Sequence, residues 1–170
     1  MPIEYIVGDV LKQPCNGDIK VIPHCCNDIG VMGAGVAAAI AKKYPRVRTH
    51  YQEYYKRCID SGKDFLGKLQ LIKVEDKVWV ANMMGQHKTA THKVDGIWVG
   101  DDGEPPIRYK KLFKAMDNLM IFMDKLDSPN CEICTCKFGS DLAGGSWDII
   151  EDYIKKTWAT KYLVKVCVLA

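Results

Sequence analysis

The chain has 170 residues, of which 48% are hydrophobic and 26% are charged, and this composition excludes global disorder and favours one compact domain over residues 1–170. The 24 Lys and Arg residues against 21 Asp and Glu give a net charge of +3, too small to predict a nucleic-acid or membrane surface from charge alone. Eight cysteines are fewer than a disulfide scaffold needs, and the N-terminal residues lack a signal-peptide pattern. We therefore expect a cytoplasmic monomer with mostly free thiols.

Hydrophobic periodicity divides the chain into short strands and amphipathic helices that alternate. In chain order we predict strands over 3–7 and 19–26, helices over 36–44 (with Pro45 as its stop) and 49–60, strands over 69–74 and 78–84, a helix over 108–126, a strand over 131–138, a helix over 147–158 and a strand over 161–169. The segment from about 87 to 106 has no clear period and is predicted as an elaborated loop with one short strand at 96–99. This order predicts a three-layer α/β/α fold whose central sheet is mixed, because a strand hairpin accompanies strand–helix–strand crossovers.

Two glycine-rich loops, 27–35 and 139–145, each follow a buried strand and precede a helix. Glycines let a backbone approach a ligand closely, and the free amides at a helix start attract phosphate. Neither loop has the spacing of a Walker or a Rossmann motif. Because ligands of open α/β sheets bind at the carboxyl ends of strands, the pair of loops predicts a diphosphate site. Each loop taken alone is also compatible with an ordinary glycine-containing turn that binds nothing.

Three segments, in this order, resemble the macrodomain family, which binds ADP-ribose. Gly8-Asp9-Val10 resembles its adenine-recognition turn, the stretch 24–37 (HCCNDIGVMGAGVA) resembles its first binding loop, and 138–147 (FGSDLAGGSW) resembles its second. The most similar branch contains the terminal ADP-ribose glycohydrolase and the yeast ADP-ribose 1″-phosphate phosphatase. The similarity runs nearly end to end, so the whole chain is expected to be one macrodomain with an elaborated loop at about 87–106.

The resemblance implies which residues hold the ligand. Asp9 accepts a hydrogen bond from the adenine amino group beside the Val10 amide, although Asp9 also fits an Asx turn. The distal ribose and one phosphate are expected at Asn27, Gly33, Ala34, Gly35 and Val36. Amides for the diphosphate are expected from the second loop, at Ser140, Leu142, Ala143, Gly144 and Gly145.

The sequence departs from the glycohydrolase pattern at the reacting end. That enzyme uses a lysine after the hairpin strand and an aspartate in the second loop, whereas here the stretch 82–86 (NMMGQ) has no lysine and Ala143 occupies the second-loop position. Lysine-adduct chemistry is therefore not expected. Lys88 follows two or three residues too late to replace it.

We expect hydrolysis at the 1″ position to depend on His24 and Asp141, with Asp28 as a further base or orienting group. A neutral imidazole at a strand end activates water or protonates a leaving group, and a carboxylate among phosphate-binding amides is costly unless it serves the reaction. The alternatives are a buried, structural His24 and a solvent-facing Asp141. No metal site is expected, because the cysteines at 131, 134 and 136 cannot converge from one strand.

The expected function is a metal-independent, cofactor-free hydrolase of ADP-ribose derivatives, first of all an ADP-ribose 1″-phosphate phosphatase. Its expected partner is ADP-ribose or ADP-ribose 1″-phosphate, with ADP-ribosylated protein or nucleic acid as further substrates and no membrane. The alternatives left open are a de-ADP-ribosylating glycohydrolase, a non-catalytic ADP-ribose reader and an RNA-binding module that would use the basic run at 42–48.

Overall fold

A computed structural model describes residues 3–126, 128 and 130–169. Its elements are β1 (Ile3–Val7), a 3₁₀ turn (Val10–Lys12), β2 (Ile19–Asn27), α1 (Gly35–Lys43), α2 (Pro45–Asp60), β3 (Leu69–Glu75), β4 (Val78–Gln86), β5 (His92–Val94), β6 (Ile97–Val99), α3 (Tyr109–Lys125), β7 (Cys131–Thr135), α4 (Trp147–Lys156), a second 3₁₀ turn (Trp158–Thr160) and β8 (Leu163–Val168). The predicted α/β fold is confirmed.

The centre of the molecule is a six-stranded mixed sheet with the order β1-β8-β7-β2-β4-β3. Every neighbouring pair is parallel except β3 and β4, which form the predicted antiparallel hairpin at one edge. The five parallel strands therefore end on the same edge of the sheet. This edge carries both glycine loops.

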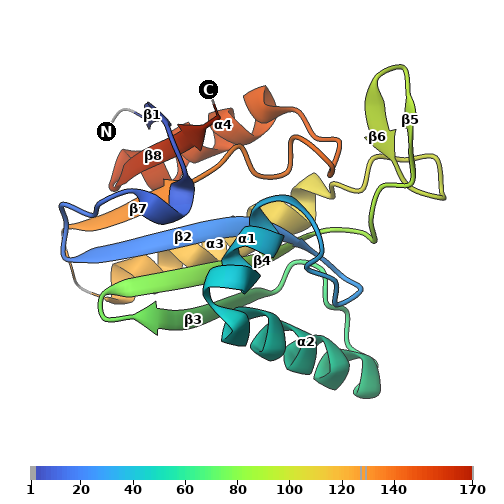
Figure 1. Ribbon diagram of the computed structural model, residues 1–170, viewed down its shortest axis with the longest axis horizontal. Coiled ribbons are helices and arrows are strands. Elements are labelled where there is room, and N and C mark those ends of the chain that lie inside the picture. The colour runs from blue at the N-terminus through green and yellow to red at the C-terminus, as the bar shows by residue number, and fades with distance from the viewer. Residues whose placement is uncertain (1–2, 127, 129, 170) are drawn as a thin grey trace.

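Helices cover both faces of the sheet, and Figure 1 shows α1 in front of it and α3 behind it. On one side, α1 and α2 bury side chains such as Ile40 and Tyr51 against β2 and β4. On the other side, α3 and α4 bury a stripe that includes Leu112, Met116 and Ile150. Burying apolar stripes on both faces produces the three predicted layers. In the described residues, no helix combines the length and the apolar character that crossing a bilayer requires.

Two element boundaries lie three or more residues from their predicted positions. Pro45 does not only stop α1: it also occupies the first turn of α2, where its fixed φ and missing N–H suit a helix start, so α2 begins four residues before the predicted Thr49. Likewise, β7 ends at Thr135 rather than at residue 138.

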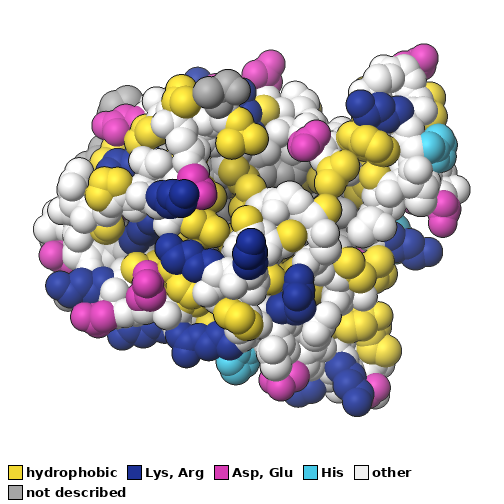
Figure 2. Space-filling model, viewed as in Figure 1, with side chains coloured by type: hydrophobic (Ala, Val, Ile, Leu, Met, Phe, Trp, Pro, Cys, Tyr) yellow, Lys and Arg dark blue, Asp and Glu magenta, His cyan; other side chains and the backbone are white. Residues whose placement is uncertain are grey.

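The elaborated loop contains a two-stranded hairpin, β5–β6, instead of one strand. In Figure 1 this hairpin stands away from the sheet, and Figure 2 shows a notch between it and the rest of the surface. Its base lies against the second glycine loop, because a Cβ on Gly144 would meet the carbonyl oxygen of Trp98 at 2.4 Å. The hairpin therefore stands over the edge of the sheet where the parallel strands end.

Candidate functional site

The candidate site lies where β7, β2 and β4, three neighbouring parallel strands, reach their carboxyl ends. The loop after β2 is the first glycine loop, and the loop after β7 is the second. The segment after β4 starts at His87 and continues into the β5–β6 hairpin. The strand order thus brings three loops together that are far apart in the sequence.

The first glycine loop is shaped by the side chain of Asn27. Its Oδ1 accepts hydrogen bonds from the amides of Ile29 and Val31 at 3.1 and 3.3 Å and from the hydroxyl of Tyr51 at 2.7 Å, and its Nδ2 donates to the carbonyl of Val31. Burial raises the pKa of Tyr51 well above its usual value, so this hydroxyl stays protonated and donates. Asn27, predicted to hold the ribose, is thereby committed to holding the loop.

The start of α1 follows this loop and is open to solvent. Gly33, Ala34 and Gly35 are exposed, and no side chain caps the helix. Gly35 adopts φ +59°, and a Cβ built on it would meet nothing within 4 Å. The amides of Gly35 and Val36 make no hydrogen bond to a described residue. Unpaired amides with a favourable helix dipole form a ready anion site.

The second glycine loop turns back on itself. The amide of Gly145 donates to the carbonyl of Gly139 at 2.8 Å, and the amide of Gly144 donates to the carbonyl of Asp141 at 2.9 Å. These two glycines therefore shape the loop, and their amides are not free for phosphate as the resemblance implied. Within the described chain, the amides of residues 140–143 make no such bond, so Ser140, Leu142 and Ala143 retain available donors.

The adenine-recognition turn follows β1. The exposed Asp9 accepts a hydrogen bond from the Leu11 amide through Oδ1 at 2.9 Å and caps the short 3₁₀ turn, while Val10 is buried. Asp9 therefore does form the Asx-type turn considered above. Its Oδ2 makes no hydrogen bond to a described residue and can accept one from a ligand.

The structure argues against His24 as the group that activates water. The ring is only 2% exposed, and its Nε2 lies 2.5 Å from Oδ1 of Asn82, which is itself fully buried between β2 and β3. Burial lowers the pKa of His24 from 6.5 to about 4, so the ring is neutral at physiological pH. The buried, neutral ring matches the structural alternative.

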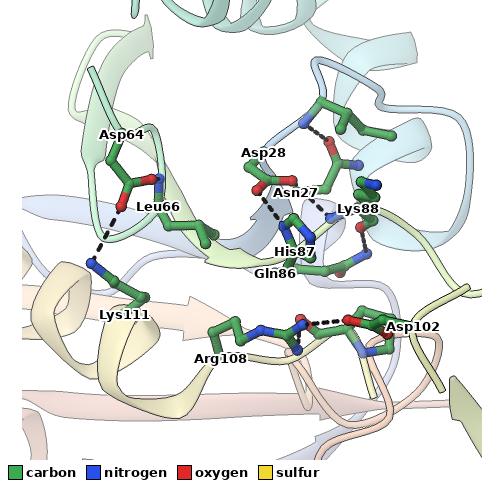
Figure 3. Close-up of polar contacts among 12 residues, drawn as sticks. Asn27, Asp28, Asp64, Leu66, Gln86, His87, Lys88, Asp102, Arg108 and Lys111 are labelled. Atoms are coloured by element: carbon green, nitrogen blue, oxygen red, sulfur yellow. Dashed lines mark hydrogen bonds and ion pairs between the residues drawn. The ribbon is translucent and has the colours of Figure 1, made fainter. Parts of the chain in front are cut away.

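Asp141 and Asp28 differ in their surroundings. Asp141 is exposed, and among the described residues its carboxylate makes no hydrogen bond or ion pair, so the structure shows no contact of this carboxylate with His24 or Asp28. Asp28 is only 15% exposed and is held tightly: its Oδ2 lies 2.7 Å from Nδ1 of His87, and its Oδ1 accepts from the Lys88 amide at 2.7 Å. Figure 3 shows this Asp28–His87 pair.

Sequence reasoning missed His87. The sequence places it at the start of the elaborated loop, three residues after the predicted strand over 78–84, whereas β4 runs on to Gln86 and His87 directly follows it. The available signal was its position: a histidine at the carboxyl end of a strand that neighbours the strand preceding Asp28. The side chain of His87 is 37% exposed, so solvent reaches it.

The chain is similar to known proteins in sequence and in fold. No protein-family model matches the chain. The ADP-ribose 1″-phosphate phosphatase of Lodderomyces elongisporus is 35% identical over 77 residues, which cover 45% of this chain and 46% of that protein, so the chain matches less than half of its length. A protein of unknown function from Bacteroides thetaiotaomicron superposes with a TM-score of 0.83 at 32% identity over 99% of both chains.

A macrodomain protein from Streptomyces coelicolor superposes with a TM-score of 0.76 at 28% identity. The superposition covers 99% of this chain and 100% of that one. The aligned region therefore spans the three loops of the candidate site as well as the sheet beneath them.

Proposed function

Because the chain belongs to the macrodomain family, we propose that it binds ADP-ribose and hydrolyses ADP-ribose derivatives at the 1″ position, with ADP-ribose 1″-phosphate as its principal substrate. The observation that carries the proposal is the pair of glycine loops on the neighbouring strands β2 and β7, both with amides that no described residue uses. Such donors suit a diphosphate without a basic side-chain cluster, in keeping with a net charge of only +3.

The ligand is proposed to lie along the carboxyl edge of the sheet. Asp9 accepts from the adenine amino group through Oδ2, and the start of α1 from Gly33 to Val36 binds one phosphate. The amides of Ser140, Leu142 and Ala143 bind the other phosphate. The distal ribose then reaches the first loop, which Asn27 holds in shape rather than binding the sugar itself.

The choice of substrate rests on the named relatives. Proteins matched by parts of the chain are called ADP-ribose 1″-phosphate phosphatases, in several cases at 33–40% identity over 53 to 77 residues. Hydrolysis of that substrate is proposed to need no metal, since side chains at the carboxyl edge of the sheet supply the proton transfers. A de-ADP-ribosylating glycohydrolase and a non-catalytic reader are the competing activities.

One set of incubations separates these activities. The protein is mixed with ADP-ribose 1″-phosphate, with ADP-ribosylated protein and with ADP-ribosylated DNA, in the presence of a chelator, and released phosphate and ADP-ribose are measured by chromatography. Phosphate release from the first substrate supports the proposal. Release of ADP-ribose from the modified protein or the modified DNA, with no phosphate release from ADP-ribose 1″-phosphate, would identify a glycohydrolase. Tight ADP-ribose binding without release of any product would identify a reader.

A further inference from the structure

The pair of Asp28 and His87 is assembled by the register of two parallel strands. Along β2 and β4 the partners advance together as far as Cys26 and Met84, but the next pair is Asn27 with Gln86. Gly85 is therefore an extra residue in β4, a bulge that advances this strand by one position. In an unbroken register Asp28 would lie opposite Gln86. Because of the bulge, Asp28 and His87 are the residues that come next after the last pair, Asn27 and Gln86.

Packing explains why the extra residue is glycine. A Cβ on Gly85 would lie 2.7 Å from two side-chain atoms of Leu112 and 3.0 Å from its Cα, so no larger residue fits under α3. The carbonyl of Gly85 accepts the amide of Arg108, and the amide of His87 donates to the carbonyl of Pro106. The bulge is thus fixed from both sides, and the position of His87 does not depend on the projecting hairpin.

The residue after His87 carries backbone strain that also serves the pair. Lys88 adopts φ +54°, a left-handed conformation that costs a non-glycine residue about 1 kcal/mol or more. In this conformation its amide donates to Oδ1 of Asp28 while the His87 ring reaches Oδ2. Strain retained where it orients a carboxylate–imidazole pair is typical of a functional site.

The hydrogen bond determines which ring nitrogen is available. Asp28 as a carboxylate only accepts, so Nδ1 of His87 carries the proton and Nε2 carries the lone pair. A further charged group near the ring is Asp102, whose own pKa is lowered first by a hydrogen bond from the Glu104 amide and also by the charges of Arg108 and His87. Asp102 is itself paired with Arg108 at 3.1 Å, which leaves Asp28 as the direct partner of the imidazole.

From this geometry we infer that His87 is the catalytic acid–base residue of the site and that Asp28 is its positioning residue, in place of His24 and Asp141. The inference rests on the proposed function. A carboxylate bonded to Nδ1 fixes the tautomer and stabilises the imidazolium that forms when Nε2 takes a proton. His24, which is buried and neutral, has no comparable route to substrate.

On ADP-ribose 1″-phosphate the step balances without a cofactor. Nε2 of His87 accepts a proton from water as the water oxygen forms a bond to phosphorus. The bond between phosphorus and the anomeric oxygen breaks with its electron pair remaining on that oxygen, and the imidazolium returns the proton there. The products are ADP-ribose and inorganic phosphate, and the ring returns to the protonation state in which it began.

The test compares four proteins: wild type, His87→Gln, Asp28→Asn and the control His92→Gln, which changes an exposed histidine on β5 of the same segment. Phosphate release from ADP-ribose 1″-phosphate gives kcat and KM, and calorimetry gives the affinity for ADP-ribose. We expect kcat of His87→Gln to fall by about 10²–10⁴-fold with little change in ADP-ribose affinity, and the control to behave as wild type.

Two readouts separate chemistry from structure. Added imidazole is expected to restore part of the kcat of His87→Ala, which a merely structural histidine would not show. Combining Asp28→Asn with His87→Ala is expected to lower kcat no further than His87→Ala alone, since Asp28 acts only through the ring. NMR of the His87 ring in wild type is expected to show the proton on Nδ1.

The outcomes that overturn the inference are distinct from those that overturn the function. If wild type releases phosphate and His87→Gln matches His92→Gln, the inference fails and the proposed function stands. Additive effects of Asp28→Asn and His87→Ala would remove Asp28 from the positioning role. If wild type binds ADP-ribose but hydrolyses nothing, the proposed hydrolase and this inference fail together.

Discussion

Replacing His24 by glutamine tests whether this residue belongs to the core or to the chemistry. Glutamine can still donate to Oδ1 of Asn82, as Nε2 of His24 does, but it cannot take up a proton. His24 has a pKa of about 4 in the folded protein because burial disfavours its charged form, against 6.5 in the unfolded chain. As the pH falls, the unfolded chain therefore binds this proton first.

The sign and size of the effect follow from that difference. A lowered folded-state pKa means that the full stability is present above pH 6.5 and is lost as the pH falls from 6.5 to about 4. At about 1.4 kcal/mol for each pH unit, the gap amounts to about 3 kcal/mol. Because the ring is fully buried, solvent screening does not reduce it.

Urea unfolding at pH 7.5 and at pH 4.5 measures this loss. Carboxylates contribute to the pH dependence of every variant, so the informative quantity is how much more stability wild type loses than His24→Gln. Between these two pH values we expect wild type to lose more unfolding free energy than His24→Gln, by most of about 3 kcal/mol. The control His50→Gln changes an exposed histidine on α2, and we expect it to lose as much as wild type. Equal losses in wild type and His24→Gln would refute the reasoning and return His24 to the list of candidate proton-transfer residues.

Two further substitutions test how the loops are built. Tyr51→Phe removes the hydroxyl that donates to both the carbonyl and Oδ1 of Asn27. We expect the free energy of unfolding in urea to fall by about 1–3 kcal/mol and ADP-ribose binding to weaken. Unchanged stability and unchanged binding would contradict the role given to Tyr51 in holding the first glycine loop. Gly144→Ala drives a Cβ into the Trp98 carbonyl, so amide hydrogen exchange in β5–β6 should become faster. Gly96→Ala has a similar positive φ but open space around its Cβ, so it should accelerate this exchange less. Equal exchange rates in the two variants would mean that the contact between Gly144 and Trp98 is unimportant.

Much of the fold could be predicted because it depends on local patterns. The strand–glycine loop–helix units reveal themselves through periodicity and through glycines such as Gly35, and the parallel edge that unites them follows from general topology rules. Pro45 was misjudged because the same residue suits both the end of one helix and the start of the next.

The Asp28–His87 pair could not be predicted in the same way. His87 meets Asp28 only because Gly85 bulges from β4, and the need for a glycine at that bulge comes from Leu112, on a helix more than twenty residues further along the chain. His24, by contrast, is a suitable proton-transfer group by its chemistry and by its place near a strand end. The sheet register decides which face of β2 carries its side chain and brings Asn82 next to it, and local sequence does not reveal that register.

The central claim is tested most directly by calorimetric titration of ADP-ribose into wild type and Gly33→Val. Gly33 is exposed beside the start of α1, and a Cβ there would have only ordinary contact with Val31 at 3.7 Å, so the variant should fold while its side chain covers the free amides. We predict one saturable site in wild type and its loss in Gly33→Val at an unchanged urea midpoint. No binding by wild type, or equal binding by a folded Gly33→Val, would contradict the account.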